Sequence, residues 1–407
     1  MASKWNDYFR RMGPAWVISA VACGPATLAS VSIAGASYGF GLLWVVVLSA
    51  AFGATAQYLA AKIGILKGKG IIALTEERLG PVWSWILTID AVVATYIAAI
   101  VLMNALVGIT GLVTGVKNPW WGVFYALLIS AIIIRGGYGW FELACKMMVG
   151  FVVLCFVVTA FQADINPSEL FQGLIPNIPG GLSSALMMAA IMGGAVHITI
   201  IGMHTYTVNE KRWKVQDLPL ARFDTIVSMG VAFGIYSLAI YTVAAAVLHP
   251  NNIQIMGATD AALGLGPLLG KGAMVIFLIG LWGATLSTIS PTFLAGAYFI
   301  FDKMGWHRSK MKGRFAVVIL VGALMSALGP FLRGSFFLLL PVMLALGLCG
   351  TPLILAIILY FLSSEHYPGI YRNSVGLYIM GSLTLLVTTI LAIRFTIQKL
   401  GIIGWLL

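Results

Sequence analysis

Long apolar segments separated by short polar connections constrain this chain more than any other feature. A helix needs about 20 apolar residues to cross a bilayer. Eleven segments approach or exceed that length, at residues 14–38, 41–66, 81–112, 119–135, 140–163, 181–208, 219–249, 265–302, 314–331, 335–362 and 373–398. Their apolar residues run continuously instead of alternating, which argues against a membrane-spanning β-barrel. With 60% hydrophobic and 9% charged residues, the sequence predicts an all-α polytopic membrane protein.

The Lys and Arg residues fall in alternate connections between these segments. "EKRWKVQDLPLAR" follows the sixth segment and "DKMGWHRSKMKGR" the eighth, whereas "QADINPSELFQGLIPNIPGG" and "HPNNIQIMGATDAALGLG" contain neither residue type. Basic connections stay in the cytoplasm. We therefore expect a cytoplasmic N-terminus and an outer C-terminus, in the cell (inner) membrane. The net charge of +11 reflects this bias and contact with anionic lipid, and indicates no nucleic-acid partner.

Two apolar segments carry helix-breaking residues at their centres. The first contains "ACGPAT" at 22–27, and the sixth contains "MGGAVHITIIGMHTYTV" at 192–208. They occupy corresponding positions if segments one to five and six to ten are inverted repeats. Paired interrupted helices of this kind indicate a transporter whose substrate binds at mid-membrane, where unwound backbone is exposed to the substrate. We expect Gly24 and Pro25 to open such a cavity, and Gly193 and Gly194 to interrupt the sixth helix.

Three long stretches resemble one known family. "GPATLASVSIAGASYGFGLLWVVVLSAAFGATAQYLAAKIGILKGK" is similar to the first two helices of the Nramp (natural resistance-associated macrophage protein) divalent-metal transporters. "LPLARFDTIVSMGVAFGIYSLAIYTVAAAVLH" resembles their seventh helix with its embedded Asp, here Asp224, and "LGPLLGKGAMVIFLIGLWGATLSTISPTFLAGAYF" resembles their eighth. The resemblance implies a single transmembrane domain over 1–407 with a leucine-transporter-like 5+5 inverted repeat: repeat one at about 14–163, repeat two at about 181–362 and an eleventh helix at about 373–398.

The chain departs from the family where the substrate should bind. The family's first-helix motif is Asp-Pro-Gly-Asn, and the matching residues are Gly24, Pro25, Ala26 and Thr27. The metal-binding carboxylate is therefore missing. The family's sixth-helix Met-Pro-His motif matches His197, Ile198 and Thr199, so an imidazole replaces the sulfur ligand.

Two further residues are candidates for moving protons. A second family histidine, linked to proton movement, matches His204, and imidazole titrates near physiological pH. The acidic residues of the family's third helix have no match in the same register; Asp90 lies several positions earlier. Acids inside a membrane are functional candidates by default, so we expect His204 and Asp90 to participate in proton coupling.

The resemblance predicts a secondary transporter of divalent metal cations, coupled to protons. Its expected metal ligands are Thr27 and His197 with nearby backbone oxygens, within a substrate site comprising Gly24, Pro25, Ala26, Thr27, Gly194, His197 and Thr199. Imidazole suits later transition metals, whereas hard ions need several oxygen ligands. His197 and His204 cannot hold one ion together if a regular helix joins them, because seven residues span about 10 Å.

Other functions stay open at this stage. Without the Asp, two half-helix N-termini with partial positive charge would face the site, so the alternative is a carrier of a small organic anion or amino acid. No metalloprotease HExxH motif or Gly-x-Ser-x-Gly elbow is present, so we expect no enzyme, and no cofactor or obligatory protein partner is indicated. Asp224, beside Arg222, is expected to cap its own helix or to form a surface pair.

Overall fold

The computed structural model describes residues 2–179, 184–255, 271–308, 310–332, 336–364 and 373–399. Every regular element in these ranges is helical. Nine helical stretches described there are long and apolar enough to cross a membrane, and Trp121–Arg135 is a shorter apolar helix. One of the nine, Pro25–Lys67, is 43 residues long and contains parts of two spans. Each of the eleven predicted segments coincides with a helix or with consecutive helices. The predicted starts of the sixth, eighth and tenth segments, at 181, 265 and 335, lie outside the described residues.

The first five spans follow a short N-terminal helix, α1 (Ala2–Arg11). They are, in chain order, α2 (Pro14–Ala22) with α3 (Pro25–Tyr38), α4 (Leu43–Lys67), α6 (Pro81–Thr114), α7 (Trp121–Arg135) and α8 (Tyr138–Ala160). The connections contain η1 (Gly39–Leu42), α5 (Ile71–Leu79) and α9 (Pro167–Gln172). Only the first of these five spans consists of two helices separated by non-helical backbone.

The second set of spans begins with another broken helix. The sixth span is α10 (Ala185–Ala195) with α11 (Ile198–Glu210), and η3 (Val215–Asp217) precedes the seventh. The seventh consists of α12 (Leu218–Thr225), η4 (Ile226–Ala232), α13 (Phe233–Val243) and η5 (Ala244–Leu248), of which η4 and η5 are π-helical. The remaining spans are α15 (Lys271–Lys303), α16 (Lys312–Ser326), α17 (Phe336–Cys349) with α18 (Thr351–Ser364), and α19 (Val375–Lys399).

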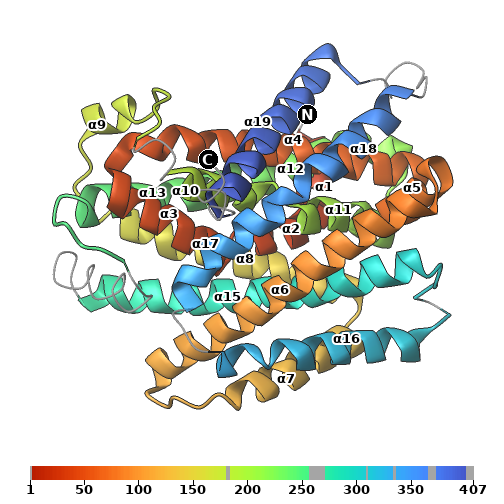
Figure 1. The fold of residues 1–407 in the computed structure, drawn as a ribbon, viewed down its shortest axis with the longest axis horizontal. Coiled ribbons are helices and arrows are strands. Elements are labelled where there is room, and N and C mark those ends of the chain that lie inside the picture. The colour runs from red at the N-terminus through yellow and green to blue at the C-terminus, as the bar shows by residue number, and fades with distance from the viewer. Residues whose placement is uncertain are drawn as a thin grey trace, which may run out of the picture.

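The helix contacts repeat with an offset of five spans. α3 of span one packs on α13 and η5 of span seven, and α10 and α11 of span six pack on α4 of span two. Likewise α2 packs on α8, and α10 packs on α17. Spans three and eight, α6 and α15, pack on each other, as do spans four and nine, α7 and α16, at the edge of the molecule (Figure 1). This reciprocity is the packing expected of a 5+5 inverted repeat.

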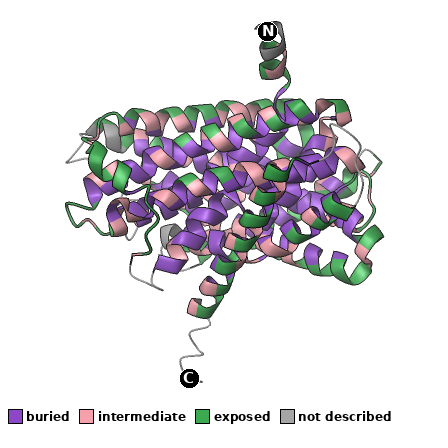
Figure 2. Cartoon of the chain, turned by 90° about the horizontal axis from the view of Figure 1, so that it is seen from above, coloured by how far each residue is buried: buried purple, intermediate pink, exposed green. Residues whose placement is uncertain are grey.

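Burial follows the same arrangement. The sixth span is the most enclosed: 89% of the 18 residues in its most apolar part are buried, whereas the corresponding share is 28% in α8 and in α19. Figure 2 shows the buried residues gathered at the centre of the bundle and α19 exposed along much of its length. The outer helices expose large apolar side chains such as Ile89, Leu154 and Val317, which is the face that a lipid-embedded protein presents to acyl chains.

Span seven is hydrogen-bonded along most of span one. Ser19 donates its hydroxyl hydrogen to the carbonyl of Ser228 in η4 (3.1 Å), and the hydroxyl of Tyr241 donates to the carbonyl of Gly39 (2.7 Å). A π-helical segment leaves carbonyl groups available for partners outside the helix. The two pieces of the broken first span are therefore held in register by one neighbouring helix.

The expectation that Asp224 caps its own helix or forms a surface pair is wrong. Its side chain is fully buried instead of lying on the surface, and Oδ2 accepts a 2.9 Å hydrogen bond from the backbone N–H of Ala15. Ala15 is the second residue of α2, so Asp224 satisfies one of the free N–H groups at the start of α2. It thus caps a neighbouring helix, because the tertiary fold brings α12 against α2.

Candidate functional site

The first break lies between α2 and α3. Cys23 and Gly24 have non-helical backbone, with Gly24 extended at φ −86° and ψ 177°, and Pro25 is the first residue of α3. Proline suits this position because its missing N–H would have no intrahelical acceptor there. The prediction that Gly24 and Pro25 break the first span is confirmed.

The second break lies later than the glycines of the sixth span suggested. Gly193 and Gly194 are helical residues near the end of α10, and the residues with non-helical backbone are Val196 and His197, of which His197 is extended. A Cβ on Gly193 would collide with the carbonyl oxygen of Leu344 in α17. The glycines therefore permit close helix packing, and the expectation that they interrupt the helix is wrong.

The two breaks are brought together through Thr27 and Gly194. A Cβ built on Gly194 would lie 2.5 Å from Thr27 Oγ1, so the two residues are in contact without a side chain between them. The expected cavity at Gly24 is absent from this part of the described structure, because Thr288 of α15 fills the space where a Cβ would point. The site is therefore closed in this conformation.

Side-chain hydroxyls form hydrogen bonds with backbone carbonyl oxygens at the breaks. The carbonyl of Ala22 accepts from Thr27 (2.7 Å), that of Gly24 from Tyr236 (2.9 Å) and that of Val196 from Thr351 (3.1 Å). The Thr288 hydroxyl lies within hydrogen-bond distance of the carbonyls of Ala20 (2.9 Å) and of Ala284 in its own helix (2.7 Å), and it donates to one of them at a time. Buried carbonyl groups need such partners. The donors come from four helices, α3, α13, α15 and α18, so the breaks form one oxygen-rich centre shared by spans one, six, seven, eight and ten.

Sequence reasoning missed Tyr236 and Thr351. Tyr236 lies in an otherwise apolar helix, and its spacing gives no indication that it reaches span one. Thr351 could have been found, because "CGTP" at 349–352 resembles "CGPAT" at 23–27 as a helix-breaking signal. It marks the division of the tenth span into α17 and α18.

His197 and Thr199 begin α11 at this centre. His197 is buried beside Gly347 of α17, where a Cβ would lie 3.2 Å from the His197 Cβ. Among the described residues, its imidazole makes no hydrogen bond. The hydroxyl of Thr199 lies 3.1 Å from that of Thr95 in α6. His197 is thus an unpaired ligand-forming group next to the break, whereas Thr199 joins spans three and six.

His204 lies further along α11, away from the break. It is fully buried, and Nδ1 is 3.1 Å from Oε1 of Gln57 in α4. Its Nε2 and the Gln57 Nε2 have no protein partner within the described ranges. Since α11 is a regular helix, the expectation that His197 and His204 do not share one ion stands.

Asp90 lies in α6 near the third break, the one between α17 and α18. A Cβ on Gly350 would collide with the Asp90 carboxylate, so the carboxylate packs directly on that glycine. Thr351, the next residue, donates to the carbonyl of Val196. Asp90 therefore contacts Gly350, the residue immediately before the threonine that bonds to the second break.

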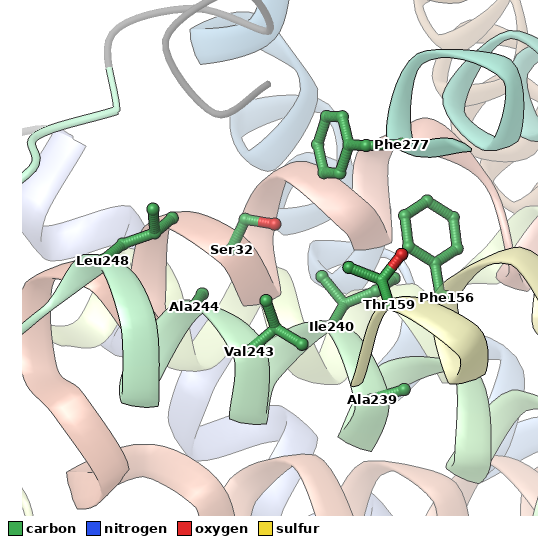
Figure 3. A pocket seen from close by; sticks show the side chains of 9 residues that line it. All are labelled: Ser32, Phe156, Thr159, Ala239, Ile240, Val243, Ala244, Leu248 and Phe277. Atoms are coloured by element: carbon green, nitrogen blue, oxygen red, sulfur yellow. The ribbon is translucent and has the colours of Figure 1, made fainter. Parts of the chain in front are cut away.

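Two of the described hollows lie away from the breaks in spans one and six. One, of about 310 Å³, is shown in Figure 3 between α3, α8, α15 and the end of span seven, and apart from Ser32 and Thr159 its lining is apolar. The other, about 2080 Å³ including open solvent, opens at the face of the basic connections and reaches Tyr206 and Asp302. The apolar lining of the first is unsuited to a cation.

Comparison with known proteins identifies the family. Residues 15–398 match the profile of the family described as natural resistance-associated macrophage protein-like, or Nramp. The chain belongs to the Nramp family. An Nramp relative from Verminephrobacter eiseniae, named divalent metal cation transporter MntH, is 28% identical over 388 residues, covering 91% of this chain and 85% of that protein. Because the relatives are named transporters, the prediction that this protein is a transporter and not an enzyme is confirmed.

Solved structures show the same Nramp architecture. A variant of the Eremococcus coleocola manganese transporter superposes with a TM-score of 0.81 at 15% identity, over 99% of this chain and 88% of that one. The transporter MhsT in complex with L-phenylalanine gives 0.64 at 14% identity, over 93% and 98% of the two chains. At these identities the superpositions show the fold alone, and they confirm the predicted leucine-transporter-like arrangement.

The centre of this Nramp chain is built without a cluster of acidic ligands. Across the described residues, no three His, Cys, Asp or Glu side chains gather where they could hold a metal ion. The side chains that the breaks bring together supply hydroxyls, and backbone carbonyls and the His197 imidazole accompany them. Such a set is neutral, which distinguishes it from the carboxylate-containing motif that the family resemblance implies.

Proposed function

We propose that this Nramp protein carries divalent metal cations through the centre formed by the breaks in spans one and six. The observation that supports this most is that four carbonyl oxygens at the two breaks, those of Ala20, Ala22, Gly24 and Val196, each lie within hydrogen-bond distance of a side-chain hydroxyl, while Thr27 and Gly194 bring the two breaks into contact. A hydroxyl that rotates away from a carbonyl exposes two oxygen ligands at once. Relatives at 28–30% identity carry the name divalent metal cation transporter.

Thr27 and His197 are the side chains that we assign to the metal. Thr27 supplies a hydroxyl oxygen at the contact with Gly194, and His197 supplies an imidazole nitrogen that has no other partner in the described structure. One nitrogen with several neutral oxygens favours manganese, iron or later transition ions over magnesium. Gly24, Pro25 and Ala26 complete the first break, and Thr199 holds the start of α11.

Transport by such a centre requires alternating access. With Thr27, Tyr236, Thr288 and Thr351 in place the centre is closed, so loading a cation requires these helices to separate on one side of the membrane. We infer that the hollow reaching Tyr206 and Asp302 is the start of the cytoplasmic route. Binding of the cation compensates the loss of the four hydroxyl contacts, which couples occupancy to conformation.

Coupling to protons is assigned to His204 and Asp90. His204 has one ring nitrogen on Gln57 and the other without a protein partner in the described ranges, so it can gain a proton without losing a bond. Asp90 contacts Gly350, next to the Thr351 that bonds to the second break. Asp90 therefore has a short structural connection to the proposed metal centre, whereas His204 is connected to it along α11.

A second candidate substrate is a small organic anion or amino acid. The neutral centre favours such a substrate, as do α3 and α11, because both helices begin at the centre and their N-terminal ends carry partial positive charge.

We assign the protein to the cell (inner) membrane with a cytoplasmic N-terminus and an outer C-terminus. The whole chain is one transport domain, with repeats at about 14–163 and 181–362, surrounded by membrane lipid.

Uptake into proteoliposomes separates the two substrates. We expect radioactive manganese to accumulate with saturation and counterflow, and Thr27→Ala and His197→Ala each to lower the rate by at least about tenfold. Thr55→Ala is the matched control, because Thr55 bonds only to its own helix at Ala51 (2.9 Å). Uptake of a carboxylate with no uptake of any divalent metal would overturn the assignment, as would single-channel currents.

The proton assignment is tested in the same vesicles. Uptake should rise with an inwardly directed proton gradient in the wild type. His204→Gln should remove that dependence while leaving metal binding, measured by calorimetry, within about twofold. Uptake that is independent of pH in the wild type would contradict proton coupling.

A further inference from the structure

The start of α2, the inner half of the broken first span, is held by three contacts, two of them buried and one part-buried. Gly13, which precedes α2, lies so close to the Glu142 carboxylate of α8 that a Cβ would collide with it. Asp224 accepts from the N–H of Ala15 (2.9 Å), and Lys146 donates from Nζ to the carbonyl of Met12 (2.6 Å). These groups are separate from Thr27 and His197, the side chains assigned to the metal.

Two acidic side chains therefore meet the partially positive end of one helix. The side chain of Glu142 is only 6% exposed, and Asp224 is fully buried. Glu142 Oε1 accepts from Lys211 at 2.6 Å, while its Oε2 has no partner among the described residues. Carboxylates at a helix N-terminus stabilise it through N–H contacts and through the helix dipole.

Ionisable groups from α8, α11 and α15 surround this pair. Span five contributes Tyr138, Cys145 and Lys146, the end of α11 contributes Lys211, and Tyr298 of α15 faces Tyr138. α2 contributes no ionisable side chain, only its backbone N–H groups. Two carboxylates thus oppose two lysines and a helix end, and adding one proton to either carboxylate shifts this balance toward net positive charge.

We propose that Glu142 and Asp224 form a proton-binding latch that controls the position of α2. With both residues ionised, α2 is held against α8 and α12, and the cytoplasmic side of the centre stays closed. Protonation of Asp224 weakens its contact with the N–H of Ala15, and protonation of either residue removes negative charge that complements the helix end, so α2 is released. The inference rests on the proposed function in that α2 then opens the route for the substrate.

Hydrogen–deuterium exchange of the full protein in lipid nanodiscs tests the latch without any metal present. After correction for intrinsic exchange rates, we expect peptides covering residues 12–23 to exchange about tenfold faster at about pH 5.5 than at about pH 7.5, a change of about 1.4 kcal/mol in the opening free energy. Glu142→Gln and Asp224→Asn, which mimic the protonated side chains, should each give the fast rate at both pH values.

Glu76→Gln is the matched control. Glu76 also pairs with a lysine at 2.6 Å, Lys303, but does not contact α2, so its substitution should leave the exchange of residues 12–23 unchanged. Exchange in α2 that is the same at both pH values in the wild type overturns the latch. So does an unchanged rate in Asp224→Asn, which keeps the proposal testable should Glu142→Gln fail to fold.

The outcome is separable from that of the proposed function. Proton-driven manganese uptake with an unresponsive α2 refutes the latch and leaves the metal carrier standing. A responsive α2 with no metal uptake supports the latch and refutes the metal assignment, because the exchange experiment contains no substrate.

Discussion

The hydroxyl of Tyr236 donates a 2.9 Å hydrogen bond to the carbonyl oxygen of Gly24, the residue at which the first span is broken. Tyr236 is fully buried in α13, so its ring and hydroxyl are held by packing. The carbonyl that the break releases is thus satisfied by a neighbouring span. A substrate that binds this carbonyl must displace the tyrosine hydroxyl.

Tyr236→Phe should therefore lower the stability of the empty protein and strengthen metal binding at the same time. Leaving the buried Gly24 carbonyl without a donor costs about 1–3 kcal/mol of unfolding free energy. A bound cation would supply the missing partner, so manganese should raise the melting temperature of Tyr236→Phe more than that of the wild type. Thermal unfolding with and without metal measures both effects, and an equal metal-induced increase in the two proteins would contradict the prediction.

Gly194→Ala should separate the two breaks and abolish uptake. The added Cβ would lie 2.5 Å from Thr27 Oγ1 and 3.3 Å from its Cγ2, so spans one and six must move apart. Adding Thr27→Ala removes both atoms and leaves the Thr27 Cβ at an ordinary 3.4 Å.

The double variant should therefore recover thermal stability but not uptake, since the proposed Thr27 ligand is gone. Gly150→Ala, in α8, is the control, because a Cβ there meets nothing within 4 Å. A double variant no more stable than Gly194→Ala alone would show that the contact with Thr27 is not what limits this position.

The pair between Glu76 and Lys303 should give stability that is lost in acid. Lys303 donates to Glu76 at 2.6 Å, and this hydrogen bond lowers the pKa of Glu76 below its usual 4.5. Because the folded pKa is the lower one, the contribution is fully present above about pH 4.5 and disappears as the pH falls through the folded pKa. The melting temperature of Glu76→Gln should thus fall less steeply over this acid range than that of the wild type.

Asp90→Asn should separate a coupling role from a packing role. Asparagine keeps the shape that contacts Gly350 but cannot release a proton, so stability should be retained while acceleration of uptake by a proton gradient is lost. Asp90→Ala should in addition leave a space beside Gly350 and lower the melting temperature. Normal proton-driven uptake by Asp90→Asn would remove Asp90 from the coupling path.

Much of the architecture could be predicted from the sequence, because membrane helices are determined by local composition. A continuous apolar run must satisfy its own backbone inside lipid, and a helix does so within one segment. All eleven spans follow from this rule, as does the break at Gly24 and Pro25, where the residue types themselves oppose a helix. The assignment of residues 14–398 to these spans needed no knowledge of their partners.

The tertiary structure decided what each polar group near the breaks contacts. Gly193 and Gly194 resemble helix breakers in sequence, yet they are helical, and their missing side chains let Leu344 and Thr27 pack against α10. Asp224, expected to cap its own helix, caps α2, and Tyr236 reaches Gly24 across 212 positions of sequence. Such pairings depend on which helices become neighbours, and hydrophobic periodicity carries no information about that choice because every span is apolar.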